Sequence, residues 1–101
     1  MPSETEILSL RKAFCDAAKR GDVAGMKPYL DNDFKTDDGR TGVILMAFSM
    51  AIKAAKPDVI DVLLDYTKEV NLSPPMLYSL ASANGGPDGL KMYQAAVRKR
   101  P

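Results

Sequence analysis

The stretch "DAAKRGDVAGM", residues 16–26, places a helix-stop signal directly before a helix-start signal. Gly21 is the residue type favoured just past a helix end, where the backbone takes a positive φ. Asp22 is a good N-cap, because its carboxylate can accept hydrogen bonds from the first free amides of a new helix. The two helices must therefore fold back on each other as a tight antiparallel pair. Gly25 and Pro28 weaken the second helix, which we expect to be short or bent.

Apolar residues at helical spacing and further cap signals predict more helices along the chain. Ser3 followed by Glu6 is a capping-box spacing that begins the first helix. Thr41 and Ser73 can cap two later helices, and Pro57 suits the first turn of another. The expected helices cover residues 4–19, 23–30, 42–55, 57–68, 74–83 and 88–98.

The segments between these helices are rich in Asp, Asn, Gly and Pro. Residues 31–42, "DNDFKTDDGRTG", are expected to form a loop whose sharpest turn signal is Asp38-Gly39. Residues 69–75, "EVNLSPP", are expected to make the second long loop and, with Pro74 and Pro75, the first turn of the next helix. The segment "NGGPDG", residues 84–89, breaks the last helical stretch. The pattern predicts three helix pairs, with a short connection inside each pair and a longer loop between pairs.

The whole chain, residues 1–101, is therefore expected to be a single all-α domain of three stacked antiparallel helix pairs. The expected helices 42–55 and 57–68 are apolar around most of their circumference, which suits a middle pair covered on both faces. Met46 and Met50 fall at core-facing spacings, so we expect core packing there rather than an adaptable binding groove.

The residue types that are missing narrow the chemistry. Cys15 is the one cysteine and there is no histidine, which removes an internal disulfide, a cysteine-based metal site and the commonest general base. We expect Cys15 to be a plain, semi-buried thiol in a cytoplasmic or otherwise intracellular protein. The N-terminus lacks a signal-peptide core, although a secreted chain whose signal was removed would look the same. The longest apolar run, residues 43–52, is about half of what a membrane span needs, which is roughly 20 residues.

Three segments together resemble the ankyrin repeat. Residues 17–30, "AAKRGDVAGMKPYL", are similar to the end of an inner helix, its turn glycine and an outer helix. Residues 37–47, "DDGRTGVILMA", are similar to the hairpin and helix start of the next repeat, and residues 58–66 to its outer helix. The resemblance covers residues 7–66 and extends loosely over 73–98.

The departures from the family pattern leave other helical folds open. Gly42 stands where the family has proline, Ile44 stands where it has histidine, and the loop between pairs is short. A different α-solenoid of three pairs, or an irregular helical bundle, would also fit the helix pattern.

The resemblance implies a non-enzymatic module, such as an adaptor, scaffold or regulatory subunit, that binds another protein through its loop tips and inner helices. By position, the contacts would be Asp37, Asp38 and Arg40 at the first tip, and Asn71 and Leu72 at the second. Neither a cofactor nor a metal is expected, and the chain could act alone or as part of a larger assembly.

Two clusters of charge offer alternatives. The four aspartates of residues 31–38 could hold a cation or do acid–base chemistry, but their spacing is not that of an EF-hand, and a solvated turn is favoured. The basic C-terminus could contact nucleic acid or an acidic protein instead, or simply complement a helix dipole. Its cations are Lys91, Arg98, Lys99 and Arg100. The net charge of +1 does not favour nucleic acid or a membrane as the partner.

Overall fold

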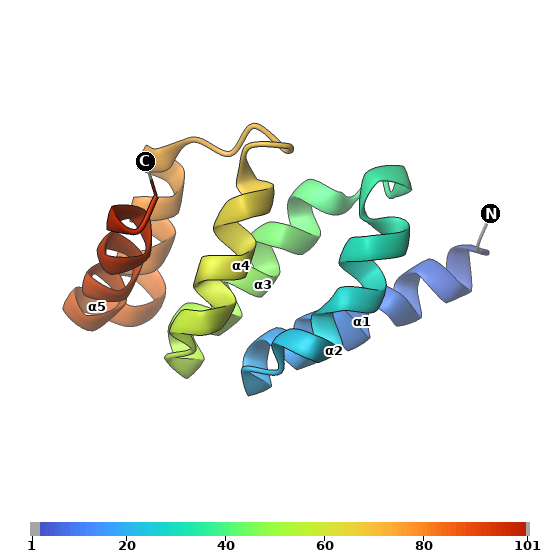
Figure 1. Ribbon diagram of the computed structural model, residues 1–101, viewed down its shortest axis with the longest axis horizontal. Helices are drawn as coiled ribbons and strands as arrows, with labels where there is room; N and C mark the ends of the chain where they lie inside the picture. Colours follow the sequence, from blue (N-terminus) through green and yellow to red (C-terminus); the bar gives the residue numbers. More distant parts are fainter. Residues whose placement is uncertain (1–2, 101) are drawn as a thin grey trace.

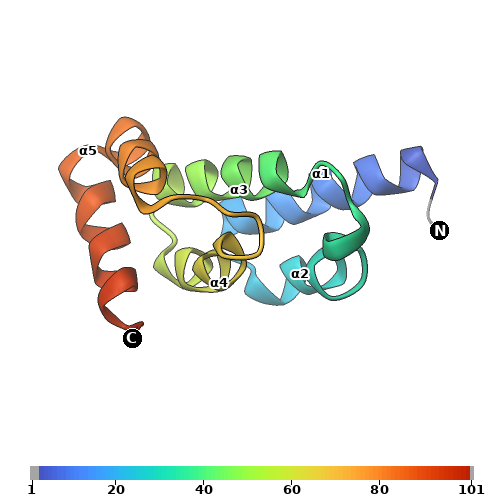
Figure 2. The same cartoon turned by 90° about the horizontal axis from the view of Figure 1, so that it is seen from above.

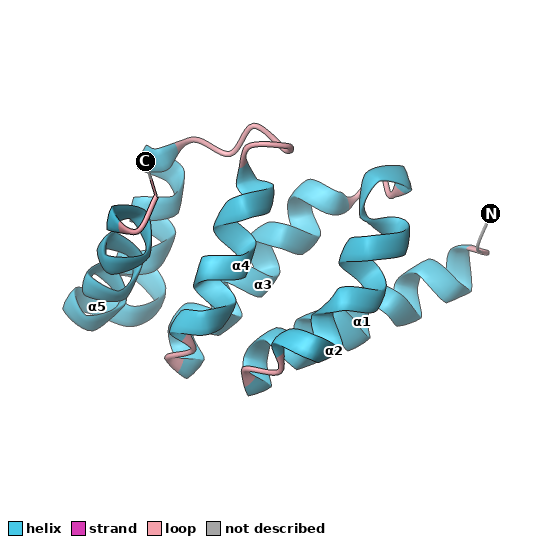
Figure 3. Ribbon diagram, in the orientation of Figure 1, coloured by secondary structure: helices cyan, strands magenta, loops and turns pink. Residues whose placement is uncertain are grey.

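Helices form all the regular structure between residues 3 and 100, the part that the computed structural model describes, and no strand occurs there (Figure 3). In chain order the elements are α1 (Glu4–Arg20), α2 (Val23–Pro28), the π-helical turn η1 (Tyr29–Asp33), the 3-10 turn η2 (Phe34–Thr36), α3 (Arg40–Ala54), α4 (Pro57–Thr67) and α5 (Pro74–Arg98). The predicted all-α class is confirmed.

The first helix boundaries follow the cap signals in the sequence. The Ser3 hydroxyl accepts a hydrogen bond from the Glu6 amide at 3.2 Å, so the capping-box serine begins α1. Gly21 ends α1 with a φ of 78°, and the Asp22 carboxylate accepts a bond from the Gly25 amide at 3.0 Å. The stop and start signals of this stretch are therefore confirmed.

The segment predicted as the first long loop is mostly helical instead. Pro28 cannot donate the next helical hydrogen bond, and the chain continues from it in the wider π register of η1. The Phe34 amide donates back to the Tyr29 carbonyl, and both aromatic rings are buried. The turn before α3 is thus confined to residues 37–39. The predicted cap at Thr41 is wrong, because α3 begins at Arg40 and includes this threonine.

The helix α5 consists of two halves. Gly86, with φ 59° and ψ −148°, breaks it within the predicted segment 84–89, so that residues 74–85 and 87–98 form separate helical stretches. Figure 2 shows the two halves folded back on each other at one end of the molecule. Gly89 is buried where they cross: a Cβ there would lie 2.5 Å from the Ala81 carbonyl oxygen and 2.9 Å from Ile52 Cγ2.

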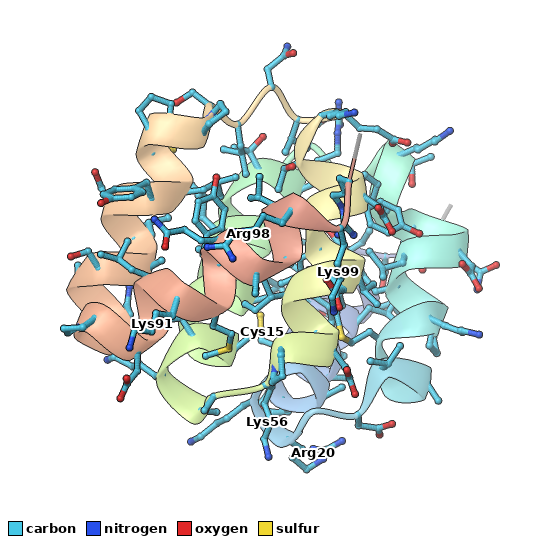
Figure 4. All side chains as sticks on the ribbon, turned by 60° about the vertical axis from the view of Figure 1, so that its left-hand side comes forward. Cys15, Arg20, Lys56, Lys91, Arg98 and Lys99 are labelled. Carbon is cyan, nitrogen blue, oxygen red and sulfur yellow. The ribbon has the colours of Figure 1, made fainter. Side chains whose placement is uncertain are left out.

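The helices lie in two layers (Figures 1 and 2). In one layer α1 packs beside α3, and α3 packs beside the first half of α5. In the other layer α2 packs under α1 and α4 packs under α3. The two tight turns also meet, because the Lys56 side chain lies against Gly21. Figure 4 shows Lys56 near Arg20, the residue before this glycine.

The core is concentrated in α3 and α4, as their apolar sequences predict. Their buried apolar residues are Val43, Ile44, Ala47, Phe48, Ala51, Ile52, Val59, Ile60, Leu63 and Leu64. Aromatic rings join these helices to their neighbours: Phe34 packs edge-on against Tyr66 of α4 at 5.0 Å, and Phe48 of α3 packs edge-on against Tyr93 of α5 at 5.9 Å. Within residues 3–100, none of the helices combines the length and hydropathy needed to cross a bilayer.

Candidate functional site

The Asp37 carboxylate is enclosed by four hydrogen-bond donors. It accepts bonds from Arg11 Nε at 2.8 Å and Arg11 Nη2, from the Tyr29 hydroxyl at 2.7 Å and from the Gly39 amide at 2.8 Å. Only 3% of this residue is exposed. The cluster therefore ties α1, η1 and the turn before α3 together at one point.

This network keeps its charges at neutral pH. The hydrogen bonds from Arg11, with further ones from Tyr29 and Gly39, hold the pKa of Asp37 well below its usual range in spite of burial. Burial and the hydrogen bond to Asp37 raise the pKa of Tyr29 well above its usual range. The carboxylate stays ionised and the phenol stays protonated, so the donors and acceptor remain matched.

The residues predicted to contact a partner differ in how far their side chains are exposed. Asp37 has no free carboxylate to offer, because its oxygens are used inside the chain. Asp38 and Asn71 are exposed, whereas Arg40 and Leu72 are half-buried. The turn before α3 and the loop after α4 do lie along the same edge of the molecule, at the top of Figure 1. A role of these four residues in binding stays a prediction.

A groove of about 500 Å³ runs between α1 and α3. Its lining comes from α1, α3 and the turn before α3, and we call it the α1–α3 groove. The lining residues are Leu8, Arg11, Lys12, Cys15, Asp16, Gly39, Gly42, Val43, Met46 and Met50. Leu8 and Met46 are each 55% exposed, and both line this one hollow, so they form an apolar patch. The wall of the groove is thus mainly apolar and open to solvent.

The exposure of Met46 corrects the expectation that this residue packs in the core, and Met50 is only half-buried. A signal for this surface was present in the sequence. A helix that is apolar around most of its circumference carries more apolar side chains than one core-facing side can bury. The surplus on α3 lies in the α1–α3 groove.

A second hollow, of about 320 Å³, continues the α1–α3 groove toward the C-terminal ends of both helices. Met50 lines both hollows, and Lys19 and Lys53 flank the second one. Within residues 3–100 neither lysine forms an ion pair, whereas Lys12 pairs with Asp16 at 2.9 Å. The lining therefore carries more positive than negative charge.

Cys15 lies in the lining of the α1–α3 groove and is 6% exposed. Burial, with a smaller effect from Asp16, raises the pKa of its thiol. A protonated, enclosed thiol is a poor nucleophile, so this residue acts as part of the groove wall. Within the described residues, no three or more Asp, Glu, His or Cys side chains come together in a way that could hold a metal ion.

The basic C-terminus is largely occupied by contacts within the chain. Lys99 pairs with Asp61 of α4 at 3.0 Å. Arg100 pairs with Asp61 at 3.3 Å and with Asp65 at 2.9 Å. Figure 4 shows Lys99 lying over α4. Of the four predicted cations, those with no ion pair inside the described part of the chain are Lys91 and Arg98.

A scan against protein-family models found no match to this chain, and searches of curated proteins and of solved structures found no match either.

Proposed function

We propose that this chain is a non-enzymatic protein-interaction module that binds another protein through the α1–α3 groove. The observation that carries the proposal is the exposure of Leu8 and Met46, at 55% each, inside a groove of about 500 Å³. Covering apolar surface is favourable by about 25 cal/mol for each Å² removed from water. A partner that covered both side chains would gain from this burial.

The resemblance to the ankyrin repeat supports the same surface. In that family the inner helices face the partner, and by position α1 and α3 are the inner helices of the first two pairs. We propose that the fold is an ankyrin-like stack in which α1, α3 and the first half of α5 form the inner layer. The predicted tip residues Asp38 and Arg40 would then border the α1–α3 groove at the start of α3.

The Asp37 network supports a binding surface that is already shaped before a partner arrives. Arg11 lines the α1–α3 groove and is held in place by two hydrogen bonds to Asp37. The Gly39 amide, at the same end of the groove, donates to Asp37 Oδ1, the oxygen that also accepts from Arg11 Nη2. A wall that is ordered in the free protein loses less conformational entropy on binding.

Affinity capture from lysate of the source cells, with quantitative mass spectrometry, tests the proposal. Met46→Glu places a charge in the α1–α3 groove and is expected to abolish capture of a specific partner. Met76→Glu is the matched control, since Met76 on α5 is 46% exposed and lies outside the groove. A partner that Met46→Glu retains and Met76→Glu loses would contradict the proposal.

A further inference from the structure

We infer that the α1–α3 groove takes an acidic amphipathic helix of the partner protein. Apolar side chains of this helix would cover Leu8, Met46 and Met50, and its carboxylates would reach Lys19 and Lys53. The inference rests on the proposed interaction function and adds the chemistry of the ligand.

The shape of the α1–α3 groove favours a helical ligand over an extended one. Its two walls are helices that run in the same direction, since Arg11 lies beside Gly39 at one end and Lys19 and Lys53 share a hollow at the other. The backbone groups of both helices are already paired within each helix. An extended peptide would bury its own backbone groups without partners, at a substantial cost, whereas a helix pairs them internally.

The α1–α3 groove and the second hollow together are long enough for about three turns of helix. The stretch of α1 from Leu8 to Lys19 spans about 17 Å at the rise of an α-helix. A third helix can seat its side chains in the depression between two neighbouring helices. Recognition of this kind uses apolar anchors at i, i+3 or i+4, and i+7 on one face of the ligand. The apolar wall formed by Leu8, Met46 and Met50 faces such a set of anchors.

The charge along the α1–α3 groove and the second hollow favours an acidic ligand. Asp16 is the one carboxylate in the lining of either hollow, and it is already paired with Lys12. Lys19 and Lys53 lie in the last turns of α1 and α3, where cations also favour the helix dipole. That effect stabilises the helix ends and leaves both ammonium groups free to meet an incoming carboxylate. A basic ligand would be repelled at the same place.

A display library of amphipathic peptides tests the inference directly. Each peptide has about four helical turns, with leucine fixed on one face and either glutamate or lysine at every flanking position. Selection against the wild-type protein is expected to enrich glutamate. An enriched peptide is then expected to bind Lys19→Glu/Lys53→Glu about tenfold more weakly in fluorescence anisotropy, because two attractions become repulsions. The milder Lys19→Gln/Lys53→Gln is expected to show a smaller loss.

Two variants separate the groove from general charge effects. Lys91→Glu/Arg98→Glu makes the same change in net charge on exposed residues of α5 and is expected to leave the affinity unchanged. Met46→Glu is expected to abolish binding of the enriched peptide. Equal losses in the two double charge reversals would overturn the inference, since the attraction would then be unspecific.

Failure of this inference can be told apart from failure of the proposed function. Enrichment of lysine, or no preference between the two charges, would overturn the acidic ligand while lysate capture sensitive to Met46→Glu still supported the groove as an interface. No enrichment over selection on the Met46→Glu protein would overturn the helical ligand. If the Met46→Glu protein still captures every partner that the wild type captures, the proposed function itself is overturned.

Discussion

Two aspartates join distant parts of this chain to arginine, yet they do so in different surroundings. Asp37 meets Arg11 in the interior, where its side chain is 2% exposed and four donors surround it. Asp61 meets Lys99 and Arg100 at the surface of α4, where its side chain is 26% exposed. A buried charge depends wholly on its partners, while an exposed one can turn to water instead. The two contacts should therefore differ in their effect on stability, although both are ion pairs.

Among the changes to polar contacts, the largest effect is expected from Asp37→Ala. This change leaves Arg11, the Tyr29 hydroxyl and the Gly39 amide without their acceptor and should lower the free energy of unfolding by about 3 kcal/mol. Urea denaturation followed by circular dichroism measures it. Asp38→Ala is the matched control, because the neighbouring aspartate is exposed and should cost under about 0.5 kcal/mol. Similar losses of unfolding free energy in the two variants would mean that the buried network contributes no more to stability than an exposed aspartate does.

The lowered pKa of Asp37 also predicts that the stability of the fold depends on pH. The folded pKa of Asp37 is lowered, so its contribution is fully present above the unfolded aspartate pKa of about 4 and is lost as the pH falls toward the folded pKa. The difference in unfolding free energy between wild type and Asp37→Ala should therefore narrow below about pH 4. A difference that stays constant down to the acid transition would show that the charge of Asp37 is not what stabilises the fold.

The two halves of α5 pack closely at Gly89, and Gly89→Ala tests how far the fold depends on this contact. The added Cβ would meet the backbone of Ala81, which cannot turn aside as a flexible side chain can. We expect a loss of about 2 kcal/mol in urea denaturation. Gly42→Ala is the control, since a Cβ there meets nothing within 4 Å and alanine favours the helix. A neutral Gly89→Ala would show that the two halves of α5 can move apart at little cost.

Asp61→Ala breaks the surface contact and completes the comparison. Loss of the pairs with Lys99 and Arg100 should lower the unfolding free energy by about 1 kcal/mol or less, and added salt should shrink the difference. Parallel urea titrations at low and high salt measure both effects. A loss of unfolding free energy as large as that of Asp37→Ala would show that the exposed aspartate stabilises the fold as much as the buried one.

Local signals account for what the sequence could predict. Gly21, Asp22 and Ser73 act within a few residues of themselves, so their caps and the helix boundaries beside them follow from spacing alone. Asp37 is one of four aspartates in residues 31–38, and nothing nearby distinguishes it. Its partner Arg11 lies 26 residues earlier in the chain, and only the packing of α1 against the turn before α3 brings the two together.

The groove was harder to predict for a related reason. Helical spacing shows that α3 is apolar on several sides, but it does not show which side a neighbouring helix leaves uncovered. Met46 and Phe48 are two residues apart in the same helix, yet one is 55% exposed and the other is fully buried. The difference depends on where α1, α4 and α5 lie around α3.

The smallest effect on stability is expected at the residue on which the proposed function most depends. Met46 already contacts water over much of its surface, so Met46→Glu should change the unfolding free energy by under about 0.5 kcal/mol. The same change should remove partner binding, because a charge in the α1–α3 groove must lose its hydration when a ligand covers it. Phe48→Ala provides the contrast, with a loss of about 4 kcal/mol from an emptied core position. If Met46→Glu instead destabilised the fold as strongly as Phe48→Ala, this methionine would belong to the core. It would then not be available to contact a partner in the α1–α3 groove.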